Sequence, residues 1–207
     1  MNKLDNAVVL ENFLPPECSV VIAKWIHFFE CEFVISKKRS TKFGDYRPPQ
    51  RGNKHRISVN HNLNSFAFLI TTVHEFAHLY TWNQYENRVK PHGKEWKDNF
   101  QKMMKPFLNK NIFPSDIKHA IELYLTNPKA SSCSDLNLFR ILKRYDIQSA
   151  DTHLIQVELL PIGGVFALPS SGRTFKKLEL IKKRYRCVEL NTNRIYLFSP
   201  VAEVAPL

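Results

Sequence analysis

The segment from Asn64 to Gln84 constrains the fold most, because it carries the pattern of a long amphipathic helix. At about 100° per residue, its apolar residues gather in a sector about 100° wide, as expected for a helix that packs one face against a core. The residues of this apolar sector are Phe66, Leu69, Val73, Phe76, Ala77 and Tyr80. We therefore expect one long helix in the middle of the chain, flanked by the rest of the core.

Two histidines lie together beside this apolar sector instead of within it. His74 and His78 are one helical turn apart, so both imidazoles can point a nitrogen at one ion. Glu75 lies farther round the helix, toward solvent or a cleft. Zinc prefers neutral nitrogen ligands and lowers the pKa of a bound water toward about 7, and a nearby carboxylate can then take the proton of that water. The pattern His74-Glu75-x-x-His78 indicates zinc-assisted hydrolysis of a peptide bond, and the alternative is a chance pair of histidines.

A third ligand is needed to complete such a site. The extended pattern H-E-x-x-H-x-x-G-x-x-H is absent, because Thr81 and Gln84 occupy its glycine and last histidine positions. This argues against the metzincin class. His92 lies between Pro91 and Gly93, where a chain can turn sharply. The downstream candidates for the third ligand are Glu86, Glu95 and His92.

The composition is that of a globular protein with a strongly basic balance. The 207 residues suit one domain, or one domain with a small appendage, and the formal net charge is +11. Residues 36–56 hold eight lysines or arginines against Asp45 alone, which indicates a basic loop or strand pair before the motif region. Such a segment favours contact with nucleic acid or another acidic surface, and a solubilising surface explains it equally well.

Cysteine usage and hydropathy limit the other classes of protein. Cys18, Cys31, Cys133 and Cys187 are widely spaced, so they indicate neither a disulfide framework nor a zinc ribbon, and we expect small buried thiols. The N-terminal segment lacks the features of a signal peptide, and no run of about 18 apolar residues is present. We expect a cytoplasmic protein that does not contact a membrane.

The order of elements predicts an α+β protein. Helices are expected at residues 18–30, about 92–106, 115–127 and 134–146, with strands at 31–36 and 56–60. Gly44, Pro48 and Pro49 indicate a loop between these strands. From about His153 the sequence changes to short β-prone runs separated by turn residues, which predicts a small antiparallel sheet.

The segments "HRISVN", "HEFAHL" and "PHGKEW" resemble, in this order, the SprT-like (Spartan-related) family of zinc metalloproteases. The resemblance is specific for about residues 20–107. It implies one Zn²⁺ held by His74, His78 and His92, with Glu75 as the general base. It also implies a minigluzincin (zincin) fold with a small sheet beside the helices. The active site should lie under an edge strand, for which residues 56–60 are the candidate.

The resemblance further implies a protease domain at residues 1–130 and a helix plus β-rich module at 131–207. Many family members carry a zinc ribbon with two cysteine pairs after the protease domain. Here only Cys187 remains in the β-rich part, with Cys133 isolated before it, so we expect a degenerate ribbon without a second zinc. Its expected core is Phe166, Phe175, Tyr185, Val188, Tyr196 and Phe198. The basic residues expected to face phosphates are Arg173, Lys176, Lys177, Lys182, Lys183, Arg184 and Arg186.

Together these features predict a zinc-dependent endopeptidase of SprT-like type with a protein substrate, and with DNA or a DNA-bound protein as partner. The alternative is a nucleic-acid-binding module whose metal site is structural or whose protease activity has decayed. Candidates for the group that stabilises the oxyanion are His55, Tyr80 and Tyr85. Nothing in the sequence predicts an oligomeric state.

Overall fold

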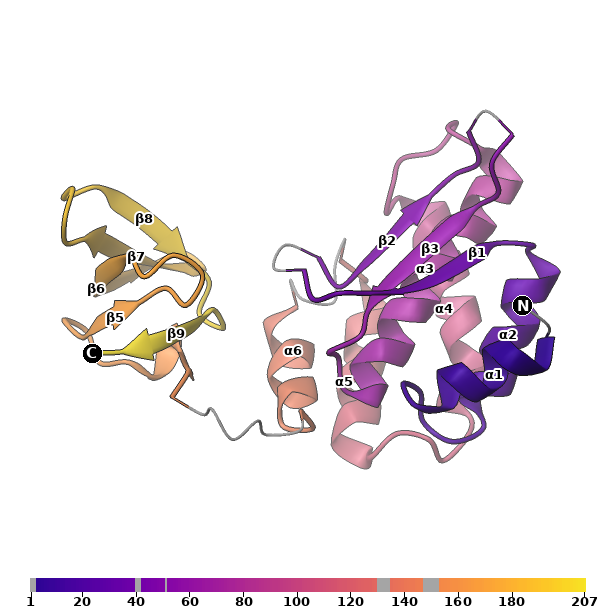
Figure 1. Ribbon diagram of the computed structural model, residues 1–207, viewed down its shortest axis with the longest axis horizontal. Helices are drawn as coiled ribbons and strands as arrows, with labels where there is room; N and C mark the ends of the chain where they lie inside the picture. Colours follow the sequence, from indigo (N-terminus) through magenta and orange to yellow (C-terminus); the bar gives the residue numbers. More distant parts are fainter. Residues whose placement is uncertain (1–2, 40–41, 51, 130–134, 147–152) are drawn as a thin grey trace. The chain divides into compact units, whose positions relative to one another are not determined.

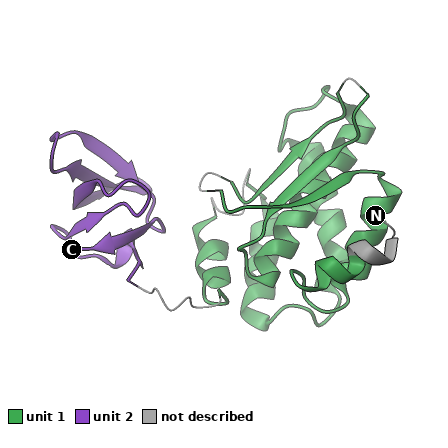
Figure 2. Ribbon diagram, in the orientation of Figure 1, with its two compact units in different colours: residues 1–146 green, residues 147–207 purple. Residues whose placement is uncertain are grey.

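The computed structural model describes residues 3–39, 42–50, 52–129, 135–146 and 153–207. It is an α+β protein with two compact units, Met1–Asp146 and Ile147–Leu207 (Figure 2). No helix in the described part of the chain is both long enough and apolar enough to cross a membrane.

Unit 1 is built around the long central helix α3 (Ser65–Tyr85). The side chain of Asn64 caps its N-terminus by accepting a hydrogen bond from the Ala67 amide at 2.9 Å. A small sheet packs on one side of α3 and helix α4 (Lys94–Leu108) packs on another (Figure 1). Because α3 is covered on more than its apolar face, Glu75 is buried and, of the two surroundings that the helical pattern allowed, faces a cleft instead of open solvent.

The sheet of unit 1 has the order β1-β3-β2. Strand β1 (Glu32–Ser36) runs parallel to β3 (Arg56–Asn60), and β2 (Gly44–Arg47) runs antiparallel to β3. Ile57 and Val59 of β3 are fully buried. The expectation that residues 56–60 form the edge strand is therefore wrong, because these residues are central and β2 is the edge. Gly44, Pro48 and Pro49 indicated a loop here, although the basic segment 36–56 as a whole was equally consistent with a strand pair, and β2 lies within it.

The remaining helices of unit 1 complete its core. Helices α1 (Lys3–Glu11) and α2 (Cys18–Phe28) pack on each other, and α5 (Ser115–Thr126) packs on α6 (Leu136–Lys143). Leu138 and Leu142 of α6 are buried in the unit 1 core, and the Tyr145 hydroxyl donates to Asp116 at 2.7 Å. Unit 1 therefore extends to Asp146, beyond the boundary after residue 130 that the sequence suggested.

Unit 2 is a six-stranded sheet with the order β4-β9-β5-β6-β7-β8. Each neighbouring pair is antiparallel. A short 3₁₀ turn (Val157–Leu159) follows β4. The strands are β4 (Ile155–Gln156), β5 (Val165–Ala167), β6 (Thr174–Ile181), β7 (Arg184–Glu189), β8 (Ile195–Phe198) and β9 (Glu203–Pro206). Strand β9 was not expected from the sequence.

The core of unit 2 contains most of the residues expected there. Phe166 and Phe175 are fully buried, and Tyr185, Tyr196 and Phe198 pack against them. Val188 lies outside this cluster, because it pairs with the exposed Lys176 on the other face of the sheet.

The described cysteines of both units are buried and unpaired. Cys18, Cys31 and Cys187 lie in the two cores, and burial raises their thiol pKa values to about 11, 12 and 11. Cys133 lies outside the described residues. The three described thiols are therefore protonated small core side chains, in agreement with the sequence expectation.

Candidate metal centre

Two neighbouring elements bring the three predicted histidines together. His74 and His78 project from the same side of α3, and His92 lies in the connection between α3 and α4. His92 has a φ of +58°, a left-handed conformation that turns the chain back toward α3. Gly93 follows, and a Cβ there would lie 2.9 Å from the Lys90 carbonyl oxygen, so this tight turn favours glycine.

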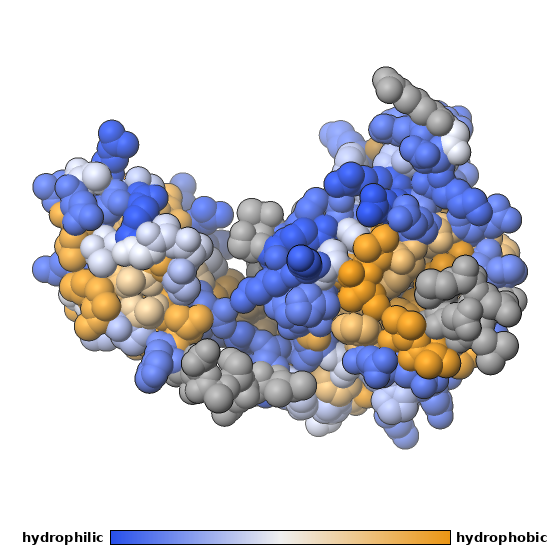
Figure 3. All heavy atoms as spheres, in the orientation of Figure 1, coloured by the Kyte–Doolittle hydropathy of each residue, from blue (hydrophilic) through white to orange (hydrophobic). Residues whose placement is uncertain are grey.

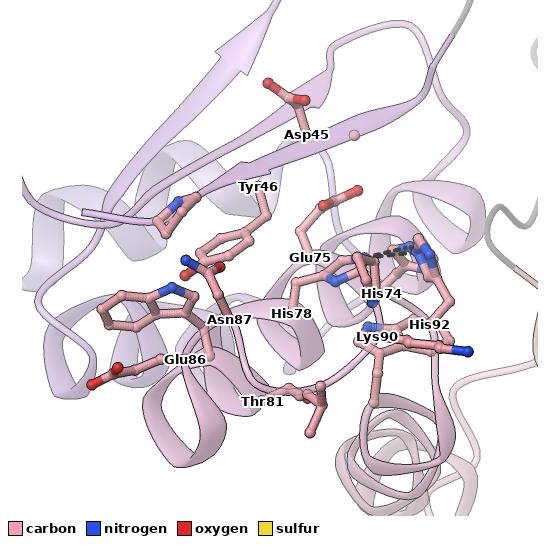
Figure 4. Close-up of a pocket in the computed structure, with 16 residues that line it drawn as sticks. Asp45, Tyr46, His74, Glu75, His78, Thr81, Glu86, Asn87, Lys90 and His92 are labelled. Atoms are coloured by element: carbon pink, nitrogen blue, oxygen red, sulfur yellow. Dashed lines mark hydrogen bonds between the residues drawn. The ribbon is translucent and has the colours of Figure 1, made fainter. Parts of the chain in front are cut away.

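The Nε2 atoms of the three histidines form a small triangle, drawn with dashed lines in Figure 4. The distances are 3.3 Å between His74 and His78, 2.8 Å between His78 and His92, and 3.3 Å between His92 and His74. A neutral ring nitrogen is either a protonated donor or a lone-pair acceptor. Of three mutually contacting nitrogens at least two are of the same kind, so the three contacts cannot all be hydrogen bonds.

An ion at the centre of this triangle would resolve that conflict, because all three nitrogens could then present lone pairs. Ligands that bind zinc tetrahedrally at about 2.0 to 2.1 Å lie about 3.3 to 3.4 Å apart, close to two of the three distances. Burial lowers the pKa of all three histidines, that of His78 to about 3, with the neighbouring imidazoles adding to the effect at His74 and His78. The residues present therefore fit a metal ion, since neutral imidazole is the form that binds one.

Aromatic packing holds the three rings in place. Trp96, in the first turns of α4, is fully buried, and its ring centroid lies 4.6, 5.2 and 4.7 Å from those of His74, His78 and His92. Phe100, one turn later, stacks on Trp96. The α4 side of the cluster is thus an apolar wall, which restricts the rotamers of the three histidines.

Glu75 lies on the opposite side of the cluster, beneath the edge strand. Only 6% of its surface is exposed, and its carboxylate accepts no hydrogen bond from a described residue. Its pKa is raised to about 8, mainly by burial and also by the negative charge of Asp45, against the opposing effect of Arg39 and Lys42. A Cβ on Gly44 would lie 2.3 Å from Oε1 of Glu75, so only glycine leaves room for this carboxylate.

A cavity of about 380 Å³ opens between β2 and the end of α3 and contains the whole cluster. Gly44, Tyr46 and Pro48 line it from the strand side, while Thr81 and Trp82 line it from α3. In Figure 4, Tyr46 and His92 appear on opposite sides of His78, and Asp45 points away from the histidines. The Tyr46 hydroxyl contacts Nδ1 of His55 at 2.9 Å.

The histidine triad, the adjacent buried glutamate and the strand above them lie within one matched region. Residues 17–119, about half of the chain, match the model of the SprT-like family. Over this stretch the chain belongs to the SprT-like family. The comparisons with curated proteins and with solved structures found no match. The SprT-like region runs from just before α2 into α5 and lies entirely within unit 1.

The SprT-like site does not include the other candidates that the sequence raised. Tyr80 and His55 line a separate hollow beside Phe29, and Tyr85 is exposed at the end of α3 outside the cavity lining. Glu86 lines the cavity but is exposed, and Glu95 lies in the first turn of α4. The described side chains that converge as a potential metal site are His74, His78 and His92.

Sequence reasoning missed three residues of the SprT-like site, each for a different reason. Gly44 was assigned to a loop. A glycine at this place, two residues before Tyr46, also fits a strand whose backbone closely approaches a side chain. Tyr46 lies on a four-residue strand too short to show alternation. Trp96 lies in the segment "PHGKEW" that carried the resemblance, and its spacing of four residues from His92 was the available signal.

Proposed function

We propose that this SprT-like protein is a zinc-dependent endopeptidase, with unit 1 folded as a minigluzincin-type protease domain. The observation that carries the proposal is the convergence of three imidazole nitrogens next to a buried carboxylate that has no described hydrogen-bond partner. Such an arrangement is costly for stability alone, because buried polar groups are normally hydrogen-bonded within the chain. It is the arrangement expected of an open metal site with a general base.

The edge strand β2 supports an extended polypeptide as the substrate. The Asn60 amide donates to the Phe43 carbonyl at 2.9 Å, so residues 43, 45 and 47 direct their backbone groups toward β3 in the antiparallel alternation. The backbone N–H and C=O groups of Gly44 and Tyr46 therefore face the free edge. An added strand would pair with them directly above the histidines, a common mode of peptide recognition.

The proposed chemistry divides between the metal and the chain. Bound zinc would polarise the scissile carbonyl and lower the pKa of water at the site. Glu75 takes a proton from the water whose oxygen attacks the carbonyl carbon, and then gives this proton to the amine nitrogen as the carbon–nitrogen bond breaks. His74, His78 and His92 act only as ligands, held in the neutral form by burial. Gly44 keeps the Glu75 carboxylate in place beneath the substrate strand.

The test is a pair of substitutions with different expected losses. We expect Glu75→Gln to retain about one zinc per chain and to lose proteolysis of an unfolded protein such as reduced casein. His92→Ala should lose both zinc and proteolysis. Glu122→Gln, an exposed change on α5, is the matched control and should alter neither. Zinc content is measured by mass spectrometry, and an active Glu75→Gln protein would refute the assignment of the base.

A second proposal is that unit 1 contacts DNA, and through it DNA-bound protein substrates. Among the described residues of the basic segment, Lys37 and Lys38 follow β1, Lys54 precedes β3, and all three are exposed, while Arg39 donates to Asn60 and Ser58. In Figure 3 the part of unit 1 that bears the β2–β3 connection is largely hydrophilic. Lysines and arginines on such a surface favour polyanions.

Unit 2 contributes less to this second proposal than its composition suggested. Lys177 is buried, and Arg173 and Arg186 pair with Glu189 and Glu179. A filter-binding titration of DNA between low and moderate salt tests the proposal, since phosphate contacts predict a steep fall in affinity. A flat response would remove DNA from the account and leave the peptidase intact. If DNA binding survives Glu75→Gln and no proteolysis is found in the parent protein, a binding module with a structural metal replaces the enzyme.

A further inference from the structure

The cavity beside the histidines continues along β2 and α3 into an apolar, aromatic-walled region. Tyr46 and Pro48 line it from the strand side, Trp82 from α3, and Val89 from the connection that leads to His92. We propose that these four residues form a substrate subsite that accepts one large apolar side chain, aromatic by preference, within two residues of the scissile bond. This inference rests on the proposed endopeptidase function, because it assigns a subsite of the same cavity.

The position of the subsite follows from how β2 and α3 run alongside each other. Gly44 lies over Glu75, and Tyr46, two residues along the strand, lies parallel to the His78 ring at 6.1 Å between centroids. Every second residue of a strand advances about 6.8 Å and one helical turn advances about 5.4 Å. Successive residues on one face of β2 therefore lie beside successive turns of α3. Trp82 follows His78 by one turn on the same face. The subsite is therefore one step along the substrate from the reacting groups.

The walls of the subsite are held before any substrate arrives. The Tyr46 hydroxyl bonds to Nδ1 of His55 at 2.9 Å, and the His55 ring packs edge-on against Trp82 at 5.1 Å. His55 does not itself line the cavity, and it contacts both Tyr46 and Trp82. It therefore fixes the orientations of these two rings relative to each other. A preformed wall lowers the entropic cost of binding a side chain, and this favours selectivity.

The chemistry of these walls determines what the subsite accepts. Two aromatic rings, a pyrrolidine ring and an isopropyl group offer apolar contact and ring edges or faces, which suit a phenyl or large aliphatic side chain. The charged residues Glu86 and Lys90 are exposed, on the connection that forms the other part of the lining. A charged substrate side chain would lose its hydration in the aromatic region without gaining a partner there.

The direct test measures binding without turnover. Acetyl-Gly-Gly-Xaa-Gly-Gly-amide peptides, in which Xaa is Phe, Leu, Ala, Lys or Glu, are titrated into zinc-loaded full-length Glu75→Gln protein and followed by NMR. We expect the Phe peptide to bind about tenfold or more tightly than the Ala peptide, and the Lys and Glu peptides to bind no better than Ala. Equal binding of all five peptides would overturn the subsite.

Two variants in the same background locate the preference. Trp82→Ala should reduce the ratio of Phe to Ala affinity to near one, and Val89→Phe should fill the subsite and favour Ala over Phe. Val89 lies in the connection instead of the core of α3, so Val89→Phe keeps the test valid if Trp82→Ala unfolds. Phe28→Ala, which removes an aromatic ring that is 76% exposed and outside this cavity, is the control and should leave the ratio unchanged. A ratio that survives both cavity variants would overturn the proposal.

A cleavage map of reduced casein by the parent protein separates this inference from the proposed function. Enrichment of Phe, Tyr, Leu or Met at one fixed position within two residues of the cut supports the subsite, and enrichment must fall in Val89→Phe. Cleavage without enrichment refutes the subsite and leaves the endopeptidase standing. Selective peptide binding without cleavage refutes the endopeptidase and leaves the subsite standing.

Discussion

The two units of this protein each bury charged or titratable side chains, but they treat them in opposite ways. In unit 2, Lys177 is 2% exposed, and its ammonium donates to the carbonyl oxygens of Leu160 and Glu158 and lies 3.9 Å from the centre of the Tyr185 ring. Glu189 is 5% exposed and accepts from Arg173 and Thr192. Both groups are satisfied by the chain itself, as a structural role requires.

In unit 1, the buried groups of the site are not satisfied in this way. The three imidazole nitrogens cannot all hydrogen-bond to one another, and the Glu75 carboxylate accepts no hydrogen bond from a described residue. Burial without partners costs free energy, so these groups are kept for something that binds there. In this protein, a functional buried polar group is distinguished from a structural one by whether it has a hydrogen-bond partner in the chain, and its degree of burial is less informative.

The largest effect expected from this comparison is on metal-dependent stability. Zinc at about 1,000 times its dissociation constant should raise the free energy of unfolding of unit 1 by about 4 kcal/mol, because only the folded site binds it. Unit 2 should not respond. Hydrogen exchange read separately for α3 and for β6 and β7, with and without a chelator, checks this. Equal protection of both units by zinc would contradict the comparison.

Removing the buried lysine of unit 2 should come next. Lys177→Ala leaves two carbonyl oxygens without their donor and opens a gap beside Tyr185, which should cost about 3 kcal/mol. Denaturant unfolding followed in unit 2 measures this, with the exposed neighbour Lys176→Ala as the matched control. A change as small as that of the control would mean that Lys177 is not a structural group.

Filling the space above Glu75 should have a moderate effect on stability and a larger one on activity. Gly44→Ala places a Cβ 2.3 Å from Oε1 of Glu75 and 2.8 Å from Cγ2 of Thr71, so the glutamate must move, at a cost of about 2 kcal/mol. Zinc content should be unchanged while proteolysis falls. Gly52→Ala is the contrasting glycine replacement: its Cβ would meet nothing within 4 Å, so it adds backbone strain at a φ of +82° without crowding Glu75 and should leave proteolysis unchanged. Normal proteolysis in Gly44→Ala would show that the position of Glu75 is not critical.

The pairing of Glu189 predicts an acid-dependent contribution to unit 2. The hydrogen bond from Arg173, aided by that from Thr192, lowers the pKa of Glu189 to about 2 from a usual 4.5. A lowered carboxyl pKa stabilises the fold above pH 4.5, and this contribution is lost as the pH falls toward 2. The difference in stability between the parent and Glu189→Gln should therefore be constant above about pH 5 and shrink below it. A difference that stays constant down to pH 2 would contradict the assignment.

The smallest effect is expected where a buried carboxylate has no partner to lose. In metal-free protein at about pH 4, where Glu75 is protonated in both the folded and the unfolded state, Glu75→Gln should change the free energy of unfolding of unit 1 by no more than about 0.5 kcal/mol, because the shape is kept and no described hydrogen bond is broken. Chemical denaturation with a chelator present measures this. Destabilisation as large as that of Lys177→Ala would mean that Glu75 is structurally paired after all.

The sequence predicted the local part of the site better than its surroundings. Two histidines one turn apart need only helical periodicity to be placed together, and Pro91 and Gly93 indicated the turn that brings His92 back. The edge strand could not be predicted in the same way. Its four residues pair with β3 through backbone groups, which the side-chain pattern does not report.

Tertiary contacts narrowed one other expectation and overturned a second. Glu75 was expected to face a cleft or solvent, and it faces a cleft in which β2 leaves only 6% of it exposed, because the strand crosses the side of α3 that periodicity alone left open. The helix that begins after Asp135 was assigned to the C-terminal module, but Leu138 and Leu142 complete the core of unit 1. The sequence pattern of one amphipathic helix shows which of its faces is apolar, but not which hydrophobic core that face packs against.

X-ray absorption at the zinc edge of the purified full chain tests the central claim most directly. The account predicts three imidazole nitrogens at about 2.0 Å and one exchangeable oxygen ligand, which a small hydroxamate replaces. The spectrum of His92→Ala should lack one nitrogen if any zinc remains. A fourth protein ligand, such as a cysteine sulfur at about 2.3 Å, or a spectrum that hydroxamate leaves unchanged, would contradict an open metal site.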